Sequence, residues 1–313
     1  LGIEDPAPEA DAGDVQAAER PLALSVLRAA QRHLATLRDA EAPVRGDVGA
    51  DHLHRMRVAL RRLRSLVRAF RDLWPADAAE RLKSHLRDTG RRLGALRDLD
   101  VALEILPPSA PALPAALQVP AQRLLGWVRT RRDAMHAEVL EWLRSPARLA
   151  AAANVDGDLA SIVTTDGDGA LPTGVAVPAR LAKAAAQLKK RALGIAEELP
   201  IEPAHELRIA AKRVRYLAEE FAELPKLDVG KAIRVVTRVQ QRFGSLCDHE
   251  VAVERLLGWL HIATGDGEHG ASTAAALGAL AMQHEAEAQR ARRRARKVLG
   301  RLDRKAVWQQ LGC

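Results

Sequence analysis

The sequence predicts an all-α protein built from two four-helix units. Alanine, leucine, arginine and glutamate dominate the chain, and clusters of β-branched or aromatic residues are scarce, which favours helices nearly throughout. Breaker residues divide the chain into two sets of helical segments, and short motifs of the first set recur in the second. We therefore expect two units that arose by an internal duplication and that pack as helical bundles.

The helices of the first unit are expected at residues 21–42, 51–74, 76–106 and 114–145. Those of the second unit are expected at 178–198, 203–224, 228–263 and 271–300. Between the two sets, glycine, aspartate and threonine gather around 154–177, a composition typical of a surface loop.

These boundaries predict the domain organisation. We expect an acidic linker at 1–20, a first unit at 21–150, a connecting loop at 151–177, a second unit at 178–300 and a C-terminal tail at 301–313. The chain begins with Leu1 rather than methionine, and we expect it to be a fragment of a longer protein or a processed chain.

Charge and composition restrict the possible partners. Lysine and arginine total 48 against 40 acids, a net charge of +8, which favours an anionic partner such as nucleic acid, a phosphate polymer or a membrane surface. With five tryptophans, three phenylalanines and one tyrosine, the chain is poorly supplied for stacking single-stranded bases. Cys247 and Cys313 are too few for a disulfide framework or a cysteine-rich zinc site, and no apolar run suits a membrane span or a signal peptide.

Two motifs recur at nearly the same offset along the chain. The segment HRMRVALRRLR at 54–64 matches HELRIAAKRVR at 205–215. The segment GALRDLDVALE at 94–104 matches GSLCDHEVAVE at 244–254. Two matches at one offset indicate a repeated unit rather than chance similarity.

A basic stripe runs beside the apolar stripe of the helix expected at 51–74, and the second unit repeats it. Helical periodicity places His54, Arg57, Arg61, Arg64 and Arg68 in the first stripe and His205, Arg208, Lys212 and Arg215 in the second, whereas Arg62 points elsewhere and Glu219 replaces the match of Arg68. The next helices carry basic ladders at four-residue spacing, namely Lys83, Arg87 and Arg91 in the first unit and Arg234, Arg238 and Arg242 in the second.

Like charges at this spacing destabilise a helix by a few tenths of a kcal/mol per pair, and a bound anion removes that repulsion. Arginine forks bind phosphate oxygens in bidentate fashion, and histidine can donate to them as well. Two alternatives stay open at this point. The stripes can be solvated faces with local acid partners, and the histidines can be helix caps or buried structural residues.

The two motifs resemble those of the CHAD family, the conserved histidine α-helical domain. The resemblance rests on 54–64 and 205–216, with LGALRDLDV at 93–101 and FGSLCDHEV at 243–251, and it spans about residues 20–300, so that a CHAD domain is expected at 21–313. It implies two pseudo-symmetric four-helix bundles with a basic central groove or channel. It also implies binding of inorganic polyphosphate, a cytoplasmic location with association to polyphosphate granules, and a CYTH-type domain upstream in a longer protein.

The resemblance carries the polyphosphate-binding role to matched positions of this chain. They are His54, Arg57, Arg61, Arg62, Arg64, His205, Arg208, Lys212, Arg213 and Arg215, with the ladders Lys83, Arg87, Arg91, Arg234, Arg238 and Arg242 added on their charge pattern. Asp98 and Asp248 match acids of the family motif, and we assign them to orienting arginine side chains.

No catalytic motif emerges, so we expect a non-enzymatic module without a cofactor or a metal. Glu285-Ala286-Glu287 lacks the lysine of a triphosphate tunnel strand, and no Walker loop, His-Glu-x-x-His pair or Gly-x-Ser-x-Gly elbow occurs. The alternatives are a nucleic-acid-binding helical module, a polyphosphate-hydrolysing enzyme that holds metal through Asp98, Asp100, Asp248 and Glu250, and a scaffold that docks an acidic partner. The arginine-rich run at 290–301 is a further candidate for anion contact.

Overall fold

The computed structural model describes residues 12–45, 50–164, 166–195, 198–225, 227, 229–264 and 270–302. This part of the chain contains helices, one isolated bridge between Pro21 and Pro172, and no strand, which confirms the all-α prediction. The α-helices are α1 (Ala12–Glu19), α2 (Leu22–Arg45), α3 (Ala50–Ala69), α4 (Ala76–Ser109), α5 (Ala115–Arg144), α6 (Pro146–Ala160), α7 (Thr173–Leu193), α8 (Ile201–Glu220), α9 (Gly230–Thr264) and α10 (Gly270–Leu302).

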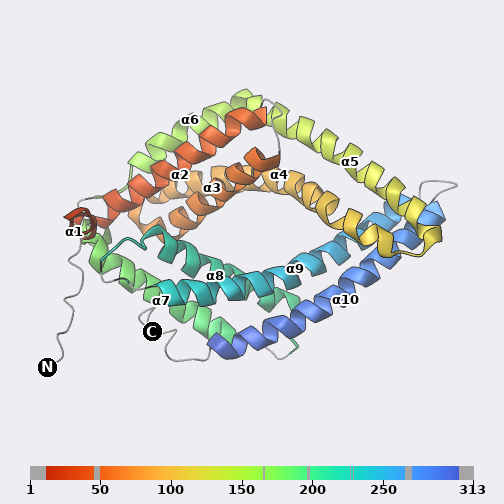
Figure 1. The fold of residues 1–313 in the computed structure, drawn as a ribbon. Helices are drawn as coiled ribbons and strands as arrows, with labels where there is room; N and C mark the ends of the chain where they lie inside the picture. The colour runs from red at the N-terminus through yellow and green to blue at the C-terminus, as the bar shows by residue number, and fades with distance from the viewer. Residues whose placement is uncertain are drawn as a thin grey trace.

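The helices form an elongated, closed outline with the two halves of the chain on opposite sides (Figure 1). Helices α2 to α6 make one side and α7 to α10 the other, with α4 and α9 on the inner faces. The long helices α4, α5, α9 and α10 run to the same end of the molecule, where α5 contacts α10. Toward the opposite end α3 contacts α8 and α2 contacts α7, so the halves also touch there.

The apolar stripes predicted for 51–74 and 203–224 are buried and form the main core. Met56 and Leu63 of α3 and Phe70, which directly follows α3, are fully buried, and Leu207 and Val214 of α8 are buried as well. Burial follows the three- and four-residue spacing because those positions share one face of a helix. The amphipathic pattern therefore decides which face of α3 and α8 turns inward.

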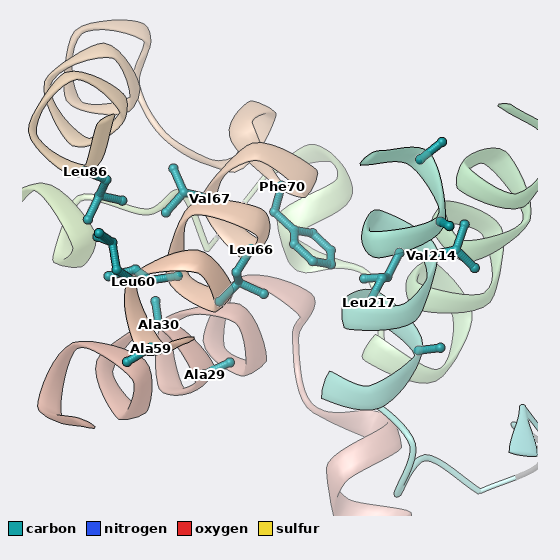
Figure 2. Close-up of a cluster of buried hydrophobic side chains, with 14 of the residues drawn as sticks. Ala29, Ala30, Ala59, Leu60, Leu66, Val67, Phe70, Leu86, Val214 and Leu217 are labelled. Atoms are coloured by element: carbon teal, nitrogen blue, oxygen red, sulfur yellow. The ribbon is translucent and has the colours of Figure 1, made fainter. Parts of the chain in front are cut away.

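The contact between the C-terminal halves of α3 and α8 joins the two halves of the chain. Figure 2 shows Leu66 and Phe70 of α3 pointing toward Val214 and Leu217 of α8. The rings of Phe70 and Phe221 meet edge to face with centroids 5.8 Å apart, a favoured aromatic geometry. We call this contact the seam; it comprises Arg62, Leu66, Phe70, Tyr216, Leu217, Glu219 and Phe221.

A second, separate apolar cluster holds the far end of the molecule together. It draws residues such as Leu106, Leu124, Leu256 and Leu280 from α4, α5, α9 and α10. Trp127 of α5 and Trp259 of α9 pack edge to face beside it, with centroids 5.3 Å apart. The end of the molecule away from the seam thus has its own core.

Two segments are more helical than the sequence suggested. The connecting loop expected at 151–177 lies in α6 up to Ala160, and α7 already begins at Thr173. Ser145 accepts a hydrogen bond from the Arg148 amide and Pro146 occupies the first turn, so α6 has a strong start that the glycine-rich composition of its end obscured. Val155 and Leu159 of α6 are buried in the main core, which supplies the energy that local propensity lacks.

The acidic linker expected at 1–20 contains α1, which contacts α7. A Cβ placed on Gly174 of α7 would lie 3.1 Å from the Ala18 Cβ, so a small residue permits the close approach of the two helices. Residues 1–11 of that linker and 303–313 of the expected C-terminal tail lie outside the described residues. None of the helices in the described ranges is long and apolar enough to cross a membrane.

Candidate functional site

A cavity of about 490 Å³ opens where α3 and α4 of one half face α8 and α9 of the other, and α10 contributes to its wall. We call it the central pocket. Its basic side chains are Arg57, Arg61, Arg97, Arg208, Lys212 and Arg255, and its acids are Asp98 and Asp248. Trp259, His284 and aliphatic side chains complete the lining. Positive charge therefore outweighs negative charge in this cavity.

Arg57 and Arg208 hold equivalent places on the two sides of the central pocket. Nη1 of Arg57 donates to the Leu93 carbonyl at 2.7 Å, and Nη2 of Arg208 lies 3.3 Å from Oδ1 of Asp248. A Cβ on Gly94 would lie 3.7 Å from Nη1 of Arg57, and one on Gly244 would lie 3.4 Å from Nε of Arg208. The two motif glycines thus lie directly beside these two guanidinium groups, so the paired motifs of each half contact each other.

Arg61 and Lys212 form the least compensated part of the central pocket. Neither has an ion pair with any residue in the described part of the chain, although the Arg61 guanidinium lies 6.0 Å from the Tyr216 ring centroid. Burial, together with the positive charges of Arg208 and Arg61, lowers the pKa of Lys212 to about 8. Burial likewise lowers the pKa of Arg57. An unpaired, partly buried cation is costly, and a bound anion would remove that cost.

The acids of the second motif each hold an arginine. Asp248 pairs with Arg208, as its expected orienting role requires, whereas Oδ2 of Asp98 lies 3.2 Å from Nη2 of Arg255 on the opposite half. The neighbouring acids also form ion pairs with arginines. Asp100 lies 3.1 Å from Nε of Arg132, and Glu250 lies 2.5 Å from Nη2 of Arg292.

These pairings leave little free acid for a metal. In the part of the chain that the structure describes, no group of three or more histidine, cysteine, aspartate or glutamate side chains is arranged to hold a metal ion.

Only part of the predicted site lies in the central pocket. Arg57, Arg61, Arg208 and Lys212 line it, whereas His54 and His205 are exposed near the starts of α3 and α8. The remaining predicted residues lie elsewhere on the surface or in the seam, and they are Arg62, Arg64, Lys83, Arg87, Arg91, Arg213, Arg215, Arg234, Arg238 and Arg242.

The outlying residues differ in their partners. Arg62 and Arg215 both approach Glu219, at 3.1 and 3.4 Å, inside the seam. Lys83 lies 3.0 Å from Glu80 and Arg91 lies 2.5 Å from Asp88, on an exposed face. Arg234, Arg238 and Arg242 are exposed and pair with none of the described acids. The first ladder therefore has the local acid partners of a solvated face, and the second does not.

Sequence reasoning missed four residues of the central pocket. Arg97, Arg255, Trp259 and His284 come from α4, α9 and α10, and none of them has an identical match in the repeat. The pairing of Asp98 on α4 with Arg255 on α9 was likewise not predicted, because helix periodicity does not show which helices contact each other. A second cavity of about 630 Å³ adjoins the first and shares Asp98, Arg255 and Trp259 with it, so this ion pair borders both.

Comparison with known proteins places the chain in a family. The model of the CHAD domain family matches residues 28–257. The chain belongs to the CHAD family.

Two solved structures are similar to this fold over most of the chain. A crystal structure of the CHAD domain from the plant Ricinus communis matches with a TM-score of 0.74 and 24% identity, over 96% of this chain and 97% of that one. PptA from Streptomyces chartreusis matches with a TM-score of 0.69 and 17% identity, over 89% of this chain and 99% of that one. No curated protein sequence matches the chain. At these identities the likeness concerns the fold.

Proposed function

We propose that this CHAD domain binds inorganic polyphosphate, with the central pocket as its principal site. The observation that carries the proposal is the pair Arg61 and Lys212. These cations occupy matched positions of the repeat, line one cavity from opposite halves, and lack an ion pair among the described residues. Four further arginines surround them, and the CHAD family is associated with polyphosphate-related proteins.

The chemistry of the pocket suits a phosphate chain. Arginine presents a planar fork to two phosphate oxygens, whereas the lysine ammonium acts as a point charge. Internal phosphates of a polyphosphate each carry a negative charge, so one chain can neutralise several cations of the pocket at once. Binding should weaken steeply with added salt, because each neutralised phosphate releases a condensed counterion.

The outlying basic residues fit a longer path for the same polymer. The ladder of Arg234, Arg238 and Arg242 has no acid partner among the described residues, so it can bind phosphate without first losing an ion pair. Lys83 and Arg91 must leave Glu80 and Asp88 to do so. We therefore place the second ladder ahead of the first as an extension of the site.

We further propose that the domain binds polyphosphate without hydrolysing it and needs no cofactor. We also propose that it lies in the cytoplasm at polyphosphate granules and is fused to a CYTH-type domain in a longer protein. An assay of phosphate release from polyphosphate with Mg²⁺ or Mn²⁺ added tests whether binding occurs without hydrolysis. Release above a protein-free blank would overturn it and favour an enzyme.

The decisive experiment is a titration of long-chain polyphosphate into the protein at near-physiological salt, with Arg61→Glu plus Lys212→Glu as the test variant. Because neither residue has an ion pair with a described residue, this variant should keep the fold while placing two negative charges in the pocket. We expect affinity to fall by about a hundredfold or more, since two cation–phosphate contacts become repulsive.

The matched control is Arg123→Glu plus Arg129→Glu on α5. It makes the same change in net charge at two exposed positions that do not line the central pocket. An equal loss of affinity in both variants would mean that net charge, and not the pocket, governs binding. Absence of binding in the wild type would overturn the proposal, and displacement of polyphosphate by a nucleic acid at equal charge would favour the nucleic-acid alternative.

A further inference from the structure

A pair of histidines forms part of the wall of the central pocket. Nδ1 of His249 on α9 lies 3.2 Å from Nδ1 of His284 on α10, and the ring centroids are 5.5 Å apart. His284 is 4% exposed, and its Nε2 has no hydrogen-bond partner in the part of the chain that the structure describes. His284 is itself one of the pocket-lining residues. A buried polar atom without a partner is unusual and calls for a ligand or water.

The Nδ1 contact restricts where protons can sit. A hydrogen bond between two Nδ1 atoms needs a proton on one of them: a neutral His284 that accepts from His249 keeps its proton on Nε2, whereas a neutral His284 that donates to His249 leaves its own Nε2 as a bare lone pair. A lone pair repels a phosphate oxygen. A His284 imidazolium instead donates Nδ1–H to His249 and Nε2–H toward the pocket, so both ring nitrogens would find acceptors once a phosphate oxygen is there.

We propose that His284 is a proton-coupled phosphate subsite: it takes up one proton from solvent when a phosphate group enters the central pocket, and it donates a charge-assisted hydrogen bond from Nε2–H to that group. The inference rests on the proposed function, because the phosphate is that of the polyphosphate chain. No bond other than hydrogen bonds forms, and the proton comes from the buffer.

The charges around the pair explain why the proton should arrive with the ligand. The cations that share the pocket with His284 are Arg57 and Arg61 of α3, Arg97 of α4, Arg208 and Lys212 of α8, and Arg255 of α9. The acids that line the pocket are Asp98 of α4 and Asp248 of α9. Glu287 of α10 also interacts electrostatically with His284. Burial and His249 lower the pKa of His284, whereas Glu287 raises it. A phosphate would reverse the local balance of charge.

The test is calorimetry of long-chain polyphosphate binding in two buffers of different ionisation enthalpy, which counts the protons taken up. At about pH 6.5 Lys212, whose pKa is about 8, is already charged and contributes little uptake. We expect the wild type to take up a fraction of a proton per site, His284→Gln to lose most of that uptake, and its affinity to fall about tenfold.

One control separates this subsite from other histidines. His85→Gln removes a part-buried histidine that lines a different cavity. Uptake should persist in this variant. Equal uptake by His284→Gln and the wild type, with polyphosphate still bound, would overturn the subsite alone, whereas absence of any binding would overturn the proposed function with it.

A second readout does not depend on a variant that folds. The ¹⁵N shifts of histidine ring nitrogens distinguish the neutral tautomers from the imidazolium in the wild-type protein. We expect polyphosphate at about pH 6.5 to move one buried histidine toward the imidazolium shifts, and His249→Gln to alter that signal. Ring-nitrogen shifts of all buried histidines that stay unchanged on binding would also overturn the inference.

Discussion

The seam and the central pocket use the same two helices in opposite ways. In the seam, Phe70 and Phe221 fill the space between α3 and α8, and Glu219 accepts contacts from Arg62 and Arg215. In the pocket, the more N-terminal Arg61 and Lys212 have no acid partner among the described residues. The comparison shows that the fold compensates the basic residues of these helices in the seam and leaves two of them without an acid partner in the pocket.

Ion pairs beside the seam also link α2 to α8. His33 of α2 lies 2.6 Å from Glu220 of α8, and Arg32 pairs with the same carboxylate. Tyr216 stacks beside the guanidinium of Arg215, whose carbon is 4.9 Å from the ring centroid. Buried rings and paired charges thus hold the halves in place, while the pocket keeps unpaired charge available.

The largest expected effect is the loss of the aromatic contact in the seam. Phe70→Ala removes a fully buried ring, and we expect the free energy of unfolding to fall by about 3–5 kcal/mol because a cavity replaces the side chain. Urea denaturation followed by circular dichroism measures it. Phe70→Leu, which keeps most of the apolar volume, should lose much less, and equal losses would show that the seam does not depend on the ring.

The next effect concerns the carboxylate of Glu220. Burial raises its pKa, but hydrogen bonds and charge from His33 and Arg32 outweigh burial, so the pKa lies below its usual value. A group with a lowered pKa stabilises the fold above its unfolded pKa and loses that contribution as pH falls through its folded pKa. We expect Glu220→Gln to lower the free energy of unfolding by about 1–3 kcal/mol at neutral pH.

The difference between Glu220→Gln and the wild type should shrink as the pH falls below 4.5, the usual pKa of a glutamate, and denaturation over a pH series measures it. A difference that is constant down to the acid limit would assign the effect to packing instead. Glu223→Gln is a control at an exposed position three residues along the chain.

The third prediction belongs to the pocket. Because the pKa of Lys212 is about 8, its charge is present below that pH and is lost as the pH rises through it, so polyphosphate affinity should fall between neutral and alkaline pH. We expect a decrease of about threefold to tenfold, which Lys212→Arg should abolish because arginine stays charged. Fluorescence anisotropy of labelled polyphosphate measures it, and an unchanged pH dependence in Lys212→Arg would show that another group titrates.

The smallest effect is expected on the first ladder. Arg91→Gln breaks an exposed pair with Asp88, and such pairs contribute about 0–1 kcal/mol to stability. The melting temperature should therefore shift by about a degree or two at most. A loss of affinity as large as that of the pocket variant would move the main site to the ladder.

The repeated basic stripes were readable in the sequence because helix periodicity is a local property. Burial of Leu207, Val214 and Phe70 follows the apolar spacing, and Arg57 and Arg208 come to equivalent places beside Gly94 and Gly244. The internal duplication itself stays a prediction, which these matched contacts support. By contrast, a loop was predicted where the second half of α6 lies, because the glycine and aspartate residues there favour a loop and the burial of Val155 and Leu159 against other helices depends on tertiary packing.

The sequence by itself determined the helical class, the family motifs, and which helix faces are apolar or basic, because each depends on residues a few positions apart. Only the tertiary structure decided that Arg61 and Lys212 share a cavity, that Arg62 and Arg215 are held by Glu219, and that His284, whose Nε2 has no hydrogen-bond partner among the described residues, lines the pocket. Those outcomes depend on which helices meet, and charge compensation is set by neighbours in space that lie far apart in the chain.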